Sequence, residues 1–107
     1  MSEYKQHEEE MRLFRLIDKI KIADLVVDVE ILPSATNHGL CKEDILSTLE
    51  RSIHDETLQA EPNKTLSIGY DGKARLLEVI FHVVSDEHIV VFHAMKCRKN
   101  YIERMLK

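Results

Sequence analysis

The sequence predicts an α+β domain, in which an antiparallel meander of β-strands carries helices packed on one face. Two segments, 3–20 and 42–54, have apolar residues at helical spacing. Between residues 57 and 95, short apolar runs alternate with turn residues, which is typical of strands joined by hairpins. With 107 residues, the whole chain (1–107) is expected to form a single domain. Residues 1–24 are expected to be an N-terminal helical extension, and residues 25–107 the α+β core.

The first helix is predicted over residues 3–20. Its apolar face is formed by Leu13, Leu16, Ile17 and Ile20, which follow the i, i+3, i+4, i+7 spacing. The acidic run 8–10 suits the N-terminal part of a helix, because negative charge there offsets the helix dipole. Three uses of the apolar stripe remain open: packing on the sheet of the same chain, formation of a homodimer, or contact with a partner protein. Packing on its own sheet is the ordinary way to build a core.

The middle of the chain predicts a strand, a short turn and a second helix. Residues 25–32 alternate between apolar and polar positions as a strand does, and Pro33 ends the run because it has no N–H to pair. Residues 33–38 can form a helical turn closed by Gly39, which tolerates a left-handed backbone. The second helix is predicted over residues 42–54, with Ile45, Leu49 and Ile53 on its apolar face.

The C-terminal part predicts mainly strands. Strands are expected over residues 57–60, 65–70, 75–84 and 88–95, with a type I′ turn at Asp71-Gly72. The strand 75–84 is apolar on both faces and is therefore expected at the centre of the sheet. Residues 85–87 form a turn, and residues 98–106 a closing helix that buries Tyr101, Ile102 and Met105.

Composition narrows the class of protein. The net charge is −4, but the first 62 residues carry 7 Lys and Arg against 14 Asp and Glu, while the remaining 45 carry 8 against 5. A basic C-terminal part is able to face a polyanion, although a solvated surface with uneven charge explains the same numbers. The acidic, polar N-terminus and the lack of a long apolar run predict a cytoplasmic protein that makes no membrane contact. Two separated cysteines argue against a disulfide framework, and no metal or cofactor is expected.

The chemistry-bearing residues cluster on and around the last three strands. No phosphate loop, nucleophile elbow or HExxH motif is present. Strand parity puts Glu78 on the face opposite Leu77 and Val79, where a carboxylate needs a cation, and Arg75, Lys64 and Lys96 are the candidates. His93 ends the last strand, where it is either hydrogen-bonded to backbone or acts as a general acid or base.

Other candidates have two interpretations each. His38 either caps the short turn before Gly39 or contacts a phosphate. The cations Lys96, Arg98 and Lys99 either form a solvated helix start or attract an anion, because cations at a helix N-terminus oppose its dipole. Metal-independent cleavage of RNA requires a base, a proton donor and cations for the phosphorane, and these residue types supply all three.

Three segments resemble the BrnT-like toxins, which are small ribonucleases of bacterial type II toxin–antitoxin modules related in fold to RelE. The segments are Pro33–Ala35 with His38–Ile45, Ile68-Gly69 with Gly72–Val79, and Val91–Arg98. The resemblance covers roughly residues 26–106 and implies a RelE/BrnT-like fold. It places His38-Gly39 before the capped helix and His93-Ala94 with Arg98 in a basic segment between the last strand and the closing helix. The sequence departs from the family where Asn37 replaces a basic residue and Cys41 replaces the capping serine.

The resemblance implies an endoribonuclease toxin that cleaves RNA by acid/base chemistry without a metal and is neutralised by a cognate antitoxin. In this hypothesis His93, Glu78 and Arg75 are the catalytic residues, and Lys64, Lys96, Arg98 and His38 bind RNA. The rival hypothesis is a non-catalytic protein-interaction module with the same fold, whose histidines and cations are structural. A metal-dependent hydrolase would need a convergent set of His and Glu ligands, which the sequence spacing does not reveal.

Overall fold

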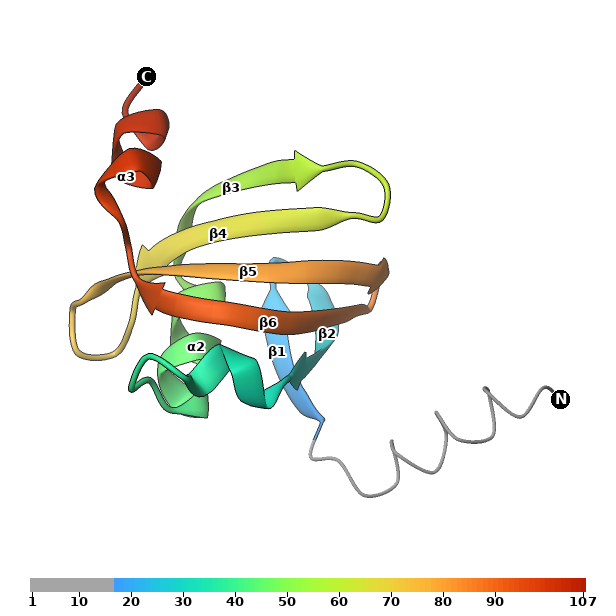
Figure 1. Cartoon of the computed structure of the whole chain (residues 1–107). Coiled ribbons are helices and arrows are strands. Elements are labelled where there is room, and N and C mark those ends of the chain that lie inside the picture. Colours follow the sequence, from blue (N-terminus) through green and yellow to red (C-terminus); the bar gives the residue numbers. More distant parts are fainter. Residues whose placement is uncertain (1–16) are drawn as a thin grey trace, which may run out of the picture.

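The computed structural model describes residues 17–107, which form a six-stranded sheet with two α-helices (Figure 1). The elements are β1 (Asp18–Ile22), β2 (Leu25–Ile31), the 3₁₀ helix η1 (Pro33–Thr36), α2 (Lys42–Glu50), β3 (Ser52–Gln59), β4 (Lys64–Tyr70), β5 (Leu76–Ser85), β6 (His88–Lys96) and α3 (Lys99–Met105). The α+β class predicted from the sequence is confirmed. Within residues 17–107, no helix is both long and apolar enough to cross a membrane.

The sheet is mixed, which corrects the prediction of a purely antiparallel one. Strands β3 to β6 form the expected antiparallel meander, with β5 in the interior of the order β1-β2-β6-β5-β4-β3. Strand β2, however, pairs parallel to β6, with Val29 opposite Ile89. These two strands are far apart in the sequence, so their pairing leaves no trace in local periodicity. Figure 1 shows β1 and β2 turning away from the meander, so that the sheet is curled.

The first strand replaces the end of the predicted first helix. Residues 18–20, assigned to a helix over 3–20, belong to β1, which forms a hairpin with β2. Ile20 is buried, and it falls on the apolar face both in the helical i, i+3, i+4 spacing and in the two-residue alternation of a strand. Pairing of Asp18 with Val29 and of Ile22 with Leu25 decides for the strand. The rest of the predicted helix lies outside the described residues.

Helix α2 is shorter than predicted, because the chain turns into β3 immediately after it. The helix ends at Glu50 rather than at residue 54. Ile53, expected on its apolar face, belongs to β3 and is 55% exposed. Strand β3 pairs along most of its length with β4, and this pairing outweighs the helical spacing of one isoleucine. The predicted strand over 57–60 is thus the second half of β3.

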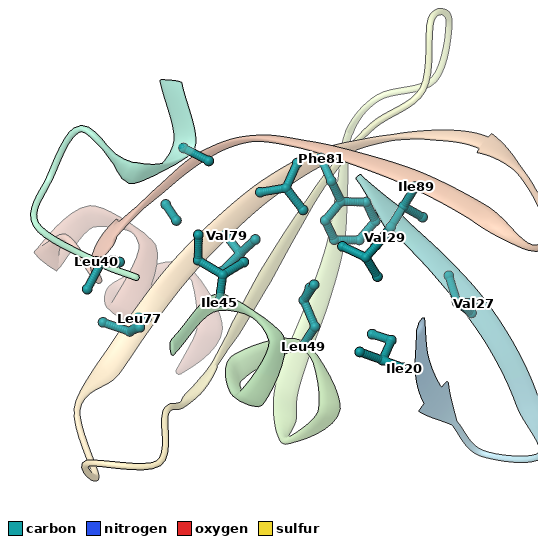
Figure 2. Packing of buried hydrophobic residues seen from close by; sticks show 13 residues of the cluster. Ile20, Val27, Val29, Leu40, Ile45, Leu49, Leu77, Val79, Phe81 and Ile89 are labelled. Atoms are coloured by element: carbon teal, nitrogen blue, oxygen red, sulfur yellow. The ribbon is translucent and has the colours of Figure 1, made fainter. Parts of the chain in front are cut away.

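One hydrophobic core lies between α2 and the concave face of the sheet. Figure 2 shows Ile45 and Leu49 of α2 directed at Val79 of β5 and Val29 of β2. Gly69 allows the helix to approach β4 closely, since a Cβ at this position would lie 2.7 Å from the carbonyl oxygen of Thr48. This close contact sets the position of α2 and leaves the opposite face of the sheet for other elements.

A second cluster lies on the other face, so the two helices do not share one face as predicted. It consists of Leu66, Ile68, Ile80 and Cys97, with partly buried side chains of α3 packed against it. Strand β5 explains the arrangement, because its alternate residues are apolar in both directions, as the sequence indicated. The predicted closing helix is confirmed as α3, but Tyr101, Ile102 and Met105 are only partly buried. The catalytic candidates must therefore be assigned to one face or the other.

The hairpin between β4 and β5 exists, but its turn is not of type I′. The residue with positive φ in this turn is Ala74 (φ 62°), whereas Gly72, which a type I′ turn would require to be left-handed, is not. The N–H of Ala74 donates to the carbonyl of Asp71, and the N–H of Asp71 donates to the carbonyl of Arg75. This pattern is a three-residue loop that closes with a left-handed residue. By contrast, the turn at 33–38 is as predicted, with η1 followed by Gly39 at φ 78°.

Candidate active site

The carboxylate of Glu78 is the centre of a compact polar cluster on the α3 face of the sheet. Its side chain is fully buried (0% exposed) although it carries a charge. Oε2 lies 2.9 Å from Nε2 of His93 and accepts a hydrogen bond of 2.8 Å from Nη2 of Arg98. Oε1 accepts hydrogen bonds from the backbone N–H (2.9 Å) and Nε (3.1 Å) of Arg98. Both oxygens of the buried carboxylate thus accept hydrogen bonds.

These hydrogen bonds keep Glu78 ionised. Burial by itself raises the pKa of a carboxyl group, because it penalises the charged form. The side-chain and backbone hydrogen bonds from Arg98, followed by the one from His93, outweigh burial and leave the pKa of Glu78 below its ordinary value. The same hydrogen bond raises the pKa of Arg98. At neutral pH the cluster therefore contains a carboxylate and a guanidinium.

The imidazole of His93 connects this buried charge to the surface. Its side chain is 23% exposed. Because the ionised carboxylate of Glu78 can only accept, Nε2 of His93 is the nitrogen that donates. In the neutral ring, Nδ1 then carries the lone pair, and it is the nitrogen able to take a proton from a bound molecule.

A second histidine lies against the first. The rings of His38 and His93 are in edge contact, with their centroids 5.7 Å apart. His38 is exposed and follows η1, which is tied to β6 by a 2.9 Å hydrogen bond from the N–H of Leu32 to the carbonyl of Val91. Ser34 adds a hydroxyl hydrogen bond of 2.7 Å to the carbonyl of Phe92. The fold thus brings together histidines that are far apart in the sequence.

Two cations flank the histidine pair on the same face. Arg98 is 47% exposed, and its guanidinium lies 5.1 Å from the centre of the Tyr101 ring. The ammonium of Lys64 lies 5.8 Å from the centre of the Phe92 ring, next in sequence to His93. This face therefore combines a polarised histidine with positive charge and aromatic surface.

Arg75 does not belong to this cluster, contrary to the sequence prediction. It donates to Asp71 (Nη2 to Oδ2, 2.7 Å) and lies 3.2 Å from Asp44 of α2, so it is on the opposite face of the sheet. Lys96 is opposite Leu77, whose side chain is in the core under α2. The cation that Glu78 requires is Arg98, and not Arg75, Lys64 or Lys96. Arg75 lies just before β5 in the hairpin turn, where its hydrogen bonds to Asp71 hold it on the α2 face, whereas Glu78 within β5 points to the α3 face.

A second charged network, centred on Asp44, was not predicted from the sequence. This carboxylate accepts hydrogen bonds from the thiol (3.1 Å) and the backbone N–H (3.0 Å) of Cys41. The thiol hydrogen bond and then the backbone one lower the pKa of Asp44 to about 2, with help from Lys73 and Arg75. A signal existed, because an acidic residue three positions after a helix cap is the pattern of a capping box.

An open pocket of about 700 Å³ lies on the α2 face, away from His93 and Glu78. Its floor is apolar, with Leu25, Phe81 and Val83 among its lining residues. The charged residues that line it are all acidic, namely Glu50, Asp55, Asp86 and Glu87. This pocket and the His93 cluster are separate surfaces of the molecule.

No protein-family model, curated protein or solved structure matches this chain. The geometry around Glu78, His93 and Arg98 is therefore the basis for a functional interpretation.

Proposed function

We propose that this protein is a metal-independent endoribonuclease that acts in the cytoplasm as the toxin of a toxin–antitoxin pair. The observation that carries the proposal is the buried Glu78 carboxylate, which orients a partly exposed His93 beside Arg98 and a second histidine. His38 and His93 come from two of the three segments that resemble the BrnT-like toxins, and their rings are in contact. This convergence supports a RelE/BrnT-like fold as part of the proposal.

The proposed reaction is an internal transfer of the phosphodiester. Nδ1 of His93 takes the proton of the ribose 2′-hydroxyl, and the 2′-oxygen attacks the phosphorus. Protonated His38 gives its proton to the 5′-oxygen as the bond from phosphorus to that oxygen breaks. The products are a 2′,3′-cyclic phosphate and a free 5′-hydroxyl, and exchange with water returns both histidines to their starting states.

The other residues have supporting roles in this proposal. Glu78 is fully buried, so it acts as a positioning residue that fixes the orientation of His93 rather than sharing the proton transfer. Arg98 and Lys64 supply positive charge for the phosphorane. Lys96 and Arg75 have no part in the reaction. An antitoxin that covers the His93 face with acidic groups would compete with RNA.

The experiment is cleavage of a single-stranded RNA by the purified protein in the presence of EDTA. Replacement of His93 by Ala is expected to lower kcat at least about 100-fold, since general acid/base groups contribute factors of this size. Replacement of His38 by Ala is expected to have an effect of the same order. His54→Ala on β3 is the matched control and is expected to keep wild-type activity.

Two results would overturn the proposal. One is RNA cleavage that is unchanged in His93→Ala, and the other is activity that disappears with EDTA and returns with a divalent metal. Growth of cells that express the wild-type protein provides a second readout, because inhibition should be lost in His93→Ala and retained in His54→Ala.

The alternative is a non-catalytic protein-interaction module, and the pocket on the α2 face favours it. An apolar floor lined by acidic charge fits a basic, amphipathic segment of another protein. If this is the function, Val83→Asp should abolish binding of such a partner, and His93→Ala should have no effect on either binding or growth.

A further inference from the structure

A bulge in β6 directs two consecutive side chains to the same face. Ile80 of β5 is opposite His93, and Phe81 is opposite Val91, so Phe92 is the extra residue between them. Val91 and Ala94 belong to the core under α2, whereas Phe92 packs with the cluster on the α3 face. Without the bulge, strand alternation would put Phe92 and His93 on opposite faces. Bulges near active sites commonly re-aim a side chain in this way.

Phe92 is part of a pair of stacked rings with one cation beside it, next in sequence to His93. Its ring is stacked on His82, with centroids 4.6 Å apart and an interplanar angle of 24°. His82 is held in place by a 2.9 Å hydrogen bond between its Nδ1 and the carbonyl of Asn63. Lys64, directly opposite His82 in the sheet, places its ammonium 5.8 Å from the centre of the Phe92 ring. We call Phe92, His82 and Lys64 the aromatic platform.

We propose that the aromatic platform binds the nucleobase of a nucleotide next to the scissile phosphate of single-stranded RNA. This inference rests on the proposed ribonuclease function and names its substrate class. Proteins bind single strands by stacking bases on aromatic side chains, while cations track the backbone. Phe92 and His82 supply the stacking surface, and the flexible ammonium of Lys64 moves from the ring to a phosphate when a base arrives.

The aromatic platform discriminates between bases by the area that stacks on it rather than by hydrogen bonds to the base edge. Stacking depends on the π-surface that every base presents, so it tolerates all four bases. Purines have the larger surface and are therefore expected to bind more tightly than pyrimidines. A base in a double helix is already stacked between its neighbours and cannot also stack on the aromatic platform. The expected substrate is therefore single-stranded.

Binding is tested with oligonucleotides that cannot be cleaved. Short single-stranded oligo(dA) and oligo(dC) lack the 2′-hydroxyl, and fluorescence anisotropy of labelled strands reports their affinity for the full chain. Phe92→Leu keeps the apolar contact with the cluster beneath but removes the ring. It is expected to weaken oligo(dA) binding about 5- to 100-fold, which corresponds to the loss of one stacked base.

Tyr70→Leu is the matched control, because Tyr70 is an exposed aromatic residue at the far end of β4. It is expected to bind oligo(dA) as the wild type does. An equal loss in Tyr70→Leu and Phe92→Leu, or no loss in Phe92→Leu, would overturn the platform. Thermal unfolding of both variants shows whether they are folded.

A second measurement does not depend on removing a side chain. The chain contains no tryptophan, so Phe92→Trp introduces a single fluorophore into the platform. Oligo(dA) should quench its emission more strongly than oligo(dC), whereas Tyr70→Trp should not respond to either. If Phe92→Trp is not quenched, the platform is refuted.

The failure of this inference is distinguishable from failure of the proposed function. RNA cleavage that requires His93 but does not change in Phe92→Leu leaves the ribonuclease intact and removes only the platform. Binding that requires Phe92, in a protein that never cleaves RNA, removes the ribonuclease and leaves a single-strand-binding surface.

Discussion

At the scale of single residues, Glu78 shows how a buried charge is kept by its partners. Its carboxylate is fully buried, so Glu78→Gln deprives the Arg98 guanidinium of its anion and replaces one of the two acceptor oxygens by an NH2 group that cannot accept. Glu78→Gln is expected to lower the free energy of unfolding at pH 7 by about 2 kcal/mol, the size of a hydrogen bond to a charged group, because the half-exposed Arg98 can be solvated when its anion is removed. Urea titration of both proteins measures this difference.

The pH dependence of the Glu78 effect has a definite sign. The folded-state pKa of Glu78 is lowered, so its stabilisation is fully present above the ordinary value of 4.5 and is lost as the pH falls below it. The difference between wild type and Glu78→Gln should therefore shrink as the pH is lowered from 5 toward 3. A constant difference over this range would contradict the ion pair.

Asp44 gives an independent test of the same linkage. Its pKa is about 2 in the folded protein against 3.8 ordinarily, so its contribution is complete above about pH 4 and is lost as the pH falls toward 2. The partners Lys73 and Arg75 are partly exposed, which screens the charge, and the contribution is on the order of 1 kcal/mol. Asp44→Asn should lower stability at pH 7 and flatten the acid limb of the stability curve, as measured by thermal unfolding from pH 2 to 7.

Ala74 occupies a backbone conformation that favours glycine. Its φ of 62° costs an L-residue roughly 1–2 kcal/mol, and glycine avoids that cost at the expense of greater freedom in the unfolded chain. Ala74→Gly is therefore expected to stabilise the protein by about 0.5–1 kcal/mol. Ala60→Gly, at an exposed turn residue that does not have positive φ, is the control, and it should not raise the melting temperature.

At the scale of elements, the contact between α2 and β4 depends on one missing side chain. A Cβ on Gly69 would lie 2.7 Å and 2.9 Å from the backbone oxygens of Thr48 and Arg51, which cannot move without shifting the end of the helix. Gly69→Ala is expected to destabilise the protein by about 1–3 kcal/mol, as overpacking does. Gly72→Ala is the control, because its Cβ meets only Ser47 Oγ at 3.9 Å.

Denaturant unfolding of the two glycine variants distinguishes a clash between helix and sheet from the general effect of replacing a glycine by alanine. A similar loss in Gly69→Ala and Gly72→Ala would show that α2 does not rest on β4 in this way. A loss of stability confined to Gly69→Ala would show that α2 packs directly on β4, which leaves the α3 face of the sheet to the His93 cluster.

At the scale of the whole molecule, the surface around His93 and the pocket on the α2 face carry different charges. The α3 face presents Lys64 and Arg98 beside the histidines, and Lys99 at the start of α3, while the pocket on the α2 face is lined by four acidic residues. If these three cations contact RNA phosphates, log K plotted against log salt should have a slope of about −2 for a single strand. Anisotropy measurements with oligo(dA) over a range of NaCl concentrations test this value.

One variant identifies the face that is responsible for the salt dependence. Lys64→Gln should make the slope less steep by about 0.7, the share of one phosphate contact. Lys21→Gln on β1, which three strands separate from the Lys64 strand β4, should leave it unchanged. The same slope in Lys64→Gln as in the wild type would place the polyanion elsewhere.

What the sequence determined by itself is the set of features that depend on neighbours in the chain. Alternation over residues 25–32, an apolar run over 75–84 and helical spacing over 42–54 identified β2, β5 and α2, although α2 ends at Glu50, because side-chain direction follows from backbone geometry over a few residues. The same reasoning put Glu78 opposite Leu77 and recognised its need for a cation.

Only the tertiary structure decided which distant residues meet. It showed that β2 runs parallel to β6, that residues 18–20 pair as a strand, and that the two helices lie on opposite faces. It also assigned Arg98 rather than Arg75 to Glu78 and, through one bulge, put Phe92 beside His93. These contacts depend on strand register and sheet curvature, which arise from burial and hydrogen bonding across the whole sheet and leave no periodic signal in any single segment.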